Sequence, residues 1–178
     1  SNTGGNIWVF EVDDDRQVSV LTNTLVLPNY RGKDKDVPSG LAVSPDGRHL
    51  YVAGNLGNKL YEFDLASGAV SRSWKVGVAP FDVAWAAGKV FVSNQGGRRP
   101  GKDDVKAVSG KGGSVRVDPV RYIASEGSVS IVDLASGLVR AELLTGLHAT
   151  ALAVSPNHRY VVVANAGSDT LSVIDTRI

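Results

Sequence analysis

The sequence of 178 residues contains no cysteine and no methionine. Without cysteine the chain has no disulfide, no thiolate nucleophile and no cysteine-based zinc or iron–sulfur site, while the redox compartment stays open. Because a natural chain starts with methionine, its absence predicts that this sequence follows a removed segment or belongs to a longer protein.

An excess of charge of one sign is also lacking, because 19 Lys and Arg residues stand against 18 Asp and Glu residues, for a net charge of +1. The overall electrostatics therefore favour neither a polyanion nor an anionic membrane, and nucleic acid is not expected as a partner. The longest apolar stretches, such as 160–164, fall far short of the roughly 20 residues that cross a bilayer, so no membrane span is expected.

What the sequence does contain is an internal repeat. Leu-Ala-Val-Ser-Pro occurs at 41–45 and again, 111 residues later, at 152–156. A divergent copy lies between them, and the segment 129–137 repeats the pattern of 60–68. One acidic residue closes the third strand-like segment of each copy. These four residues are Glu11, Asp64, Asp133 and Asp175.

Each repeated segment is short, rich in Val, Ile, Leu, Tyr and Phe, and without helical periodicity, which predicts an all-β chain. Ser44-Pro45-Asp46-Gly47 is typical of a tight turn. The Asp64 carboxylate is expected to accept a backbone amide hydrogen two residues on. A repeat of about 40 residues with four antiparallel strands is the sequence signature of a β-propeller blade.

The segments 41–55, 63–68 and 161–175 resemble the YVTN-type β-propeller repeat. Narrower stretches at 93–100, 127–133 and 146–148 resemble the propeller that precedes an alkaline-phosphatase-superfamily phosphoesterase domain in exported bacterial proteins. This resemblance implies a seven-bladed ring, a metal-dependent phosphoesterase domain beyond these residues, and a periplasmic or secreted location, for which these residues themselves carry no signal.

The repeat divides the chain into four parts. Residues 1–39 form the end of one blade and a connection, 40–77 a blade, 78–146 a blade with an insertion at 95–127, and 147–178 an incomplete blade. These parts amount to 13 strands, or about three to three and a half blades, whereas closed propellers have four to eight. We therefore expect a partial propeller, completed by a missing remainder of the ring or by a second copy as a homodimer.

The insertion 95–127 is the main departure from the repeat. It contains seven glycines, and its basic residues exceed its acidic ones by seven to four. The basic residues are Arg98, Arg99, Lys102, Lys106, Lys111, Arg116 and Arg121. Glycine lets backbone amides approach an anion, and arginine binds phosphate or carboxylate with two nitrogens, so Arg98, Arg99 and Lys102 are candidate anion ligands. The alternative is a solvated loop, partly ordered by Val115, Val117 and Ile123.

Other polar residues give weaker signals. His148 lies at a junction between blades and is the best single polar candidate, although a structural histidine is the commoner case. His49 and His158 are expected in surface turns. The run 13–15 reads as a solvated turn and not as a calcium loop, because the alternating ligand spacing is missing. The tryptophans are expected in the core. They are Trp8, Trp74 and Trp85.

No catalytic residue, metal site or cofactor is predicted, since no nucleophile elbow, paired histidine ligands or Walker spacing occurs. The sequence thus favours a non-catalytic binding or scaffolding module whose partner is an anionic small molecule, a protein or a glycan. Two alternatives stay open. One is a lactonase-like or other hydrolytic propeller with a metal in its channel, and the other is a cell-surface adhesion module.

Overall fold

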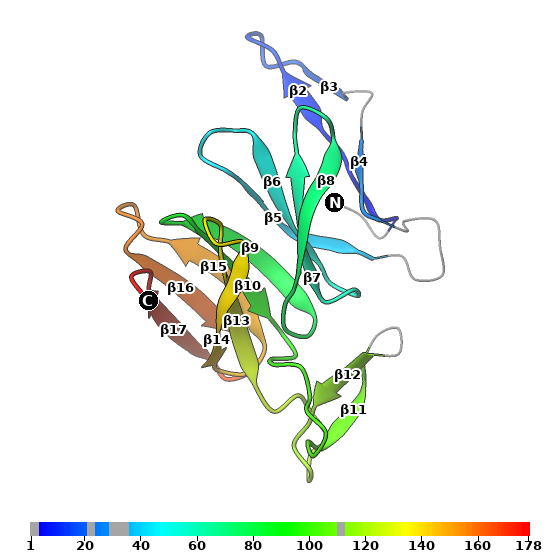
Figure 1. Ribbon diagram of the computed structural model, residues 1–178, viewed down its shortest axis with the longest axis vertical. Helices are drawn as coiled ribbons and strands as arrows, with labels where there is room; N and C mark the ends of the chain where they lie inside the picture. Colours follow the sequence, from blue (N-terminus) through cyan, green and yellow to red (C-terminus); the bar gives the residue numbers. More distant parts are fainter. Residues whose placement is uncertain (1–3, 21–23, 29–35, 110–112) are drawn as a thin grey trace.

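The computed structural model describes residues 4–20, 24–28, 36–109 and 113–178, and every regular element in these ranges is a β-strand (Figure 1). The described residues accordingly include no long apolar helix that could cross a membrane. The predicted basic residue Lys111 lies outside the described ranges.

Two complete four-stranded antiparallel sheets occupy the middle of the molecule and correspond to two propeller blades. The second blade consists of β5 (Pro38–Val43), β6 (His49–Gly54), β7 (Lys59–Asp64) and β8 (Ala69–Lys75). The third blade consists of β9 (Pro80–Ala86), β10 (Lys89–Asn94), β13 (Gly127–Asp133) and β14 (Leu138–Thr145).

The outer blades are smaller. The fourth blade has three strands, β15 (Ala149–Val154), β16 (Tyr160–Asn165) and β17 (Thr170–Asp175). In the first blade, β1 (Asn6–Ile7) pairs with β4 (Leu25–Val26), and β2 (Phe10–Val12) pairs with β3 (Val18–Val20). The insertion carries its own hairpin, β11 (Lys106–Ser109) and β12 (Gly113–Arg116). The prediction of an all-β chain with partial propeller blades is confirmed.

The second, third and fourth blades stand side by side with their first strands adjacent, because β9 contacts β5 on one side and β15 on the other (Figure 1). Because neighbouring strands are antiparallel, the connections between them lie on two opposite edges of the blades, which we call the turn rim and the junction rim. The turn rim carries the turns 44–48, 65–68, 134–137 and 155–159. The junction rim carries the connections 55–58, 76–79, 95–126 and 146–148.

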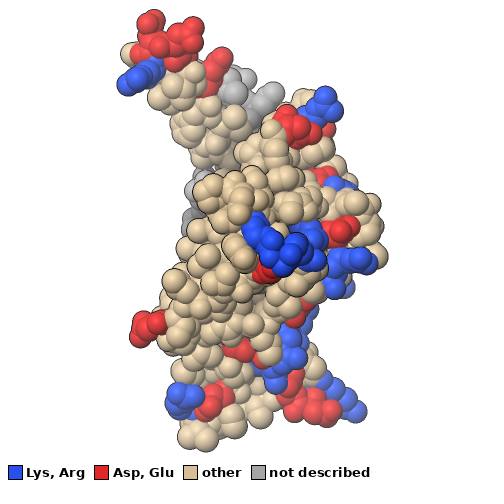
Figure 2. All heavy atoms as spheres, turned by 90° about the vertical axis from the view of Figure 1, so that its left-hand side faces the viewer, with Lys and Arg blue, Asp and Glu red and all other residues tan. Residues whose placement is uncertain are grey.

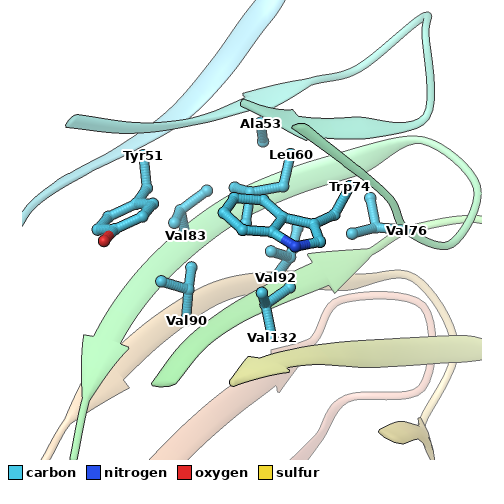
Figure 3. Close-up of a cluster of buried hydrophobic side chains, with 9 residues drawn as sticks. All are labelled: Tyr51, Ala53, Leu60, Trp74, Val76, Val83, Val90, Val92 and Val132. Atoms are coloured by element: carbon cyan, nitrogen blue, oxygen red, sulfur yellow. The ribbon is translucent and has the colours of Figure 1, made fainter. Parts of the chain in front are cut away.

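The hydrophobic core lies between neighbouring blades. Between the second and third blades, Tyr51, Leu60 and Trp74 pack against Val83 and Val90 (Figure 3). A second cluster joins the third and fourth blades, and a third joins the first and second. Alternation of side chains along each strand makes this possible, because every second residue faces the same neighbouring sheet.

The three tryptophans differ in burial, which corrects part of the sequence prediction. Trp74 is buried, and its indole nitrogen donates to the carbonyl of Gly137 at 2.8 Å. Trp85 is only half-buried. The prediction that Trp8 lies in the core is wrong, since 47% of its surface is exposed at the interruption between β1 and β2.

Candidate functional site

The insertion is held to the junction rim by its two adjacent arginines. Arg98 donates from Nε and Nη2 to the two carboxylate oxygens of Glu126, both at 3.0 Å, and its backbone amide donates to the same residue. Arg99 donates to the backbone carbonyls of Val76 at 2.7 Å and Asn58 at 2.5 Å. Both predicted anion ligands therefore already have acceptors within the protein.

Glu126 also binds a second arginine, Arg116. Arg116 on β12 donates to the Glu126 carboxylate at 2.5 Å and forms an ion pair with Asp104 at 2.9 Å. This network ties the hairpin to the point where the insertion returns to β13. Two arginines and two carboxylates balance one another in this network, whereas Arg99 donates to backbone carbonyls and not to a carboxylate of the network. Anion binding at Arg98 and Arg99 stays a prediction.

The other two predicted site residues lie apart from this network. Lys102 is exposed in a turn of the insertion. His148 is exposed at the junction before β15 with a φ of 57°, and its carbonyl accepts the amide hydrogen of Ala166. Ala79 holds the same repeat position before β9 and has a φ of 51°. The unusual backbone at His148 is thus a property of the repeat.

A buried polar group underlies the insertion. The Asn94 amide nitrogen donates to the hydroxyls of Ser128 and Ser130, at 3.1 and 2.9 Å, and Ser128 donates to Glu142 at 2.7 Å. Burial raises the pKa of Glu142, which the hydroxyl of Ser128 offsets only in part. Asn165 at the same position in the fourth blade donates to two hydroxyls in the same way, so this arrangement belongs to the fold.

The recurrent aspartates hold turns, as expected. Asp64 accepts the backbone amide of Ser67 at 2.8 Å, and Asp133 accepts that of Ser136 at 2.7 Å. In both turns the amide belongs to the third residue after the aspartate and not, as predicted for Asp64, to the second. Asp175 does accept the amide of the second residue after it. Asp13 likewise accepts a nearby amide. Among the described residues, no three His, Cys, Asp or Glu side chains form a group that could hold a metal ion.

A pocket of about 400 Å³ opens on the turn rim between the second and third blades. We call it the inter-blade pocket. It is lined by Ser44, Pro45, Asp46, His49, Tyr51, Arg72, Trp85 and Leu134. The charges on this side of the molecule are of both signs, with basic side chains gathered near its middle (Figure 2).

Behind the pocket, three polar side chains form a cross-strand row in the second blade. Tyr51 on β6 pairs in register with Glu62 on β7, which pairs in register with Arg72 on β8. We call these residues the polar row. Figure 3 shows Tyr51 at one end of the core cluster, with Trp74 and Val76 at the other. The row therefore borders the apolar core on one side and the pocket on the other.

Glu62 and Arg72 are joined at two points. Arg72 donates from Nε at 2.9 Å and from Nη2 at 2.5 Å to the two oxygens of Glu62, and Ser71 donates to the same carboxylate at 2.6 Å. Burial raises the pKa of Glu62, but these hydrogen bonds outweigh it and the pKa is lowered. Burial and the neighbouring Glu62 raise the pKa of Tyr51 to about 12, so its hydroxyl stays protonated at neutral pH.

The repeat supplies an internal comparison for this row. In the third blade the same three register positions hold Phe91, Ile131 and Ala141. In the fourth blade the first two positions hold Val162 and Val173. A propeller blade in this chain therefore folds with an apolar row at this place. Of these three blades, only the second has a tyrosine, a buried carboxylate and an arginine there.

Two further side chains complete the pocket. The Nδ1 atom of His49 is buried and has no hydrogen-bond partner. Trp85 on β9 faces the polar row from the third blade, and its ring lies 5.7 Å from that of His158 at an angle of 79°. The fourth blade has Val154 where the third has Trp85. Comparing the repeats position by position identifies these polar and aromatic replacements, whereas a search for catalytic motifs does not.

No family model and no curated protein matches this sequence. Among solved structures, a protein of unknown function from Desulfotomaculum acetoxidans is similar over 98% of this chain and 49% of its own length, at 12% identity and a TM-score of 0.63. The chain thus spans about half of that protein.

Two proteins proposed to be 6-phosphogluconolactonases match less well. The one from Bacteroides uniformis has 14% identity and a TM-score of 0.45, with 96% of this chain and 61% of its own covered. The one from Bacteroides fragilis has 17% identity and a TM-score of 0.44, with 96% and 60% covered. The first similarity shows a shared fold, and the fold is what the comparisons establish.

Proposed function

We propose that the chain is a non-catalytic binding module of the β-propeller type, and that it binds a small ligand in the inter-blade pocket. The observation that carries this proposal is the polar row beside that pocket, where the third and fourth blades have apolar residues. Because the third and fourth blades fold with apolar residues at these positions, the fold does not require polar side chains there. The polar side chains of the second blade therefore call for a separate explanation.

The energetics support a role beyond stability. Removing the Glu62 carboxylate from water is costly, and replacing an ion pair with a buried partner by apolar residues is often neutral or stabilising. The apolar triplet of Phe91, Ile131 and Ala141 shows that this chain contains such a solution. Polar groups beside a cavity are characteristic of ligand sites, where a few of them orient a ligand against apolar walls.

The test compares the wild-type protein with Y51F/E62I/R72A, in which the polar row takes the apolar pattern of the third blade. Ligand-observed NMR with a mixed library of small molecules should find at least one that binds the wild type saturably and loses at least tenfold in affinity in the variant. Ligands that bind both proteins equally, or none that bind the wild type, would contradict the proposal.

The same protein samples test the two alternatives. Turnover of a lactone or a phosphoester that a chelator abolishes would support a hydrolytic propeller instead. Retention of a protein on the chain without dependence on the polar row would support an adhesion module acting through another surface. Neither has a specific observation in its favour among the described residues.

We also propose, from the YVTN-type resemblance, that these blades belong to a longer exported protein with a phosphoesterase domain, located in the periplasm or secreted. The parent open reading frame on both sides of this segment tests the proposal directly. A frame without further blades and without such a domain would contradict it.

A further inference from the structure

We propose that the inter-blade pocket binds a neutral sugar residue, either as a free sugar or at the end of a glycan. This inference rests on the proposed binding function and adds to it the chemical class of the ligand. Three properties of the pocket lead to it: its wall, its hydrogen-bonding groups and its charge.

The wall of the pocket is aromatic. Trp85 is half-buried, so part of the indole stays accessible, and its contact with His158 fixes the ring orientation. An accessible indole offers a large, rigid apolar surface at little cost in conformational entropy. The face of a pyranose ring that carries only C–H groups matches such a surface, and a volume of about 400 Å³ lies in the lower part of the range for small-molecule sites.

The hydrogen-bonding groups suit hydroxyls, which both donate and accept. The side chain of His49 lines the pocket with a ring that carries two nitrogens, of which the unpartnered Nδ1 is itself buried. Arg72 keeps donors beyond those used by Glu62, because its Nη1 makes one long bond of 3.3 Å to the Leu134 carbonyl and its side chain is 41% exposed. The hydroxyl of Tyr51 can act in both ways. Donors and acceptors thus stand together at one pocket.

The charge of the pocket disfavours an anion. Glu62 neutralises Arg72 through two hydrogen bonds, so no unpaired arginine faces the pocket. Asp46 adds a carboxylate, which accepts hydrogen bonds from the Ser44 hydroxyl and the Arg48 amide. An anionic ligand would be repelled by the carboxylates of Glu62 and Asp46, and the one arginine at the pocket is already paired with Glu62. A neutral polyhydroxyl ligand meets no such repulsion.

The experiment titrates the protein with methyl glycosides of neutral hexoses and 6-deoxyhexoses, and with N-acetylneuraminic acid as an anionic sugar. Binding is followed by saturation-transfer NMR and by tryptophan fluorescence. At least one neutral glycoside should bind saturably, and the anionic sugar should bind at least tenfold more weakly. A glycan array then separates recognition of a terminal residue from recognition of the free sugar.

The variants come from the repeat itself. Trp85→Val introduces the residue type that the fourth blade has at the equivalent position, Val154, and should weaken glycoside binding at least tenfold. The matched control is Trp8→Val, which removes an exposed tryptophan of the first blade and should leave binding unchanged. If Trp85→Val does not fold, E62I/R72A serves in its place and should weaken binding to the same degree.

The outcomes distinguish this inference from the proposed function. Binding of a non-sugar molecule that depends on the polar row, without binding of any glycoside, would overturn the sugar inference and keep the binding module. Preference for the anionic sugar would also overturn it. Absence of any ligand that depends on the polar row would contradict both.

Discussion

The carboxylate of Glu62 and the guanidinium of Arg72 lie side by side on neighbouring strands of the second blade, joined by two hydrogen bonds of 2.9 and 2.5 Å. Glu62 is almost fully buried, whereas the Arg72 side chain reaches the inter-blade pocket. The guanidinium lies 5.0 Å from the ring of Trp74, with which it forms a cation–π contact. This pair connects the core of the second blade with the candidate ligand site.

Replacing one partner of this pair should cost more than replacing both. In Glu62→Ile, Arg72 loses its carboxylate, and we expect about 2 kcal/mol of lost stability, below the range for fully buried pairs because Arg72 is partly exposed. In E62I/R72A two of the three positions carry the residues of the third blade and no charge is left unpaired, so stability should return to within about 1 kcal/mol of the wild type. Denaturant unfolding measures both. A double variant as unstable as the single one would contradict the argument.

The stabilising effect of Glu62 should disappear in acid. Its pKa in the folded protein lies below the ordinary value of 4.5, so ionisation favours the folded state above that pH and the advantage is lost as the pH falls through the lowered pKa. The difference in Tm between the wild type and Glu62→Gln should therefore be largest above about pH 5 and should shrink below it.

Glu142→Gln is the control for that measurement, with the opposite sign. The pKa of Glu142 is raised, so its ionisation destabilises the folded protein, and this variant should be the more stable protein at pH 7. That advantage should vanish as the pH falls below about 4.5, where the carboxyl group is protonated in both states. If Glu62→Gln and Glu142→Gln both raised the Tm at pH 7, or both lowered it, the opposite pKa shifts of the two glutamates would be contradicted.

Glu126 should fasten the insertion without being needed for the blades. Glu126→Gln weakens the bonds to Arg98 and Arg116, and trypsin should then cleave within 99–121 at least several times faster while the thermal unfolding of the blades changes little. Limited proteolysis with mass spectrometry locates the cuts. Asp103→Asn, at an exposed position in the same segment, is the control and should leave the cleavage rate unchanged.

The predicted anion site can be tested at the paired arginines. R98A/R99A should lower the Tm by at least about 2 °C in phosphate-free buffer, because four side-chain hydrogen bonds are lost. Anion binding predicts in addition that phosphate raises the Tm of the wild type and of the control Lys106→Ala, but not of R98A/R99A. An equal response of all three proteins would contradict an anion site there.

If a second copy of the chain completes the ring of blades, the outer face of the fourth blade should form part of the contact between the two copies. Leu171 and Val173 on β17 are 70% and 65% exposed, and Trp8, Phe10 and Val12 of the first blade are exposed as well. Sedimentation should then show about twice the 18.7 kDa of one chain, and Val173→Lys should restore the monomer, unlike the control Val108→Lys on the insertion. A monomer of the wild-type chain at high concentration would rule out this pairing.

Much of the fold could be predicted because it depends on local patterns that recur. The motif at 41–45 and 152–156 marks a first strand and its turn in two blades, and the aspartates mark the ends of third strands. The structure has strands at these places. Turn chemistry also predicted that Asp64 accepts a backbone amide hydrogen, although the amide lies three residues on and not two. The exposure of Trp8 could not be predicted, because it depends on which distant residues cover its side chain.

The candidate site was harder to predict, for a related reason. Arg98 and Arg99 were expected to face a ligand, but the fold brings Glu126 and the carbonyls of Val76 and Asn58 to them. The sequence predicts His49 in a surface turn and Trp85 in the core, whereas His49 is the first residue of β6 and Trp85 is half-buried. They line one pocket because two different blades place them there.

By itself, therefore, the sequence determined the all-β class, the blade repeat, the turns and the insertion, since each is encoded in residues that are neighbours along the chain. Only the tertiary structure decided which charges pair and where a cavity opens. Ion pairs and pockets form between groups that are distant in sequence, such as Arg98 and Glu126 or Tyr51 and Trp85, and their distances are fixed only when the blades pack against one another.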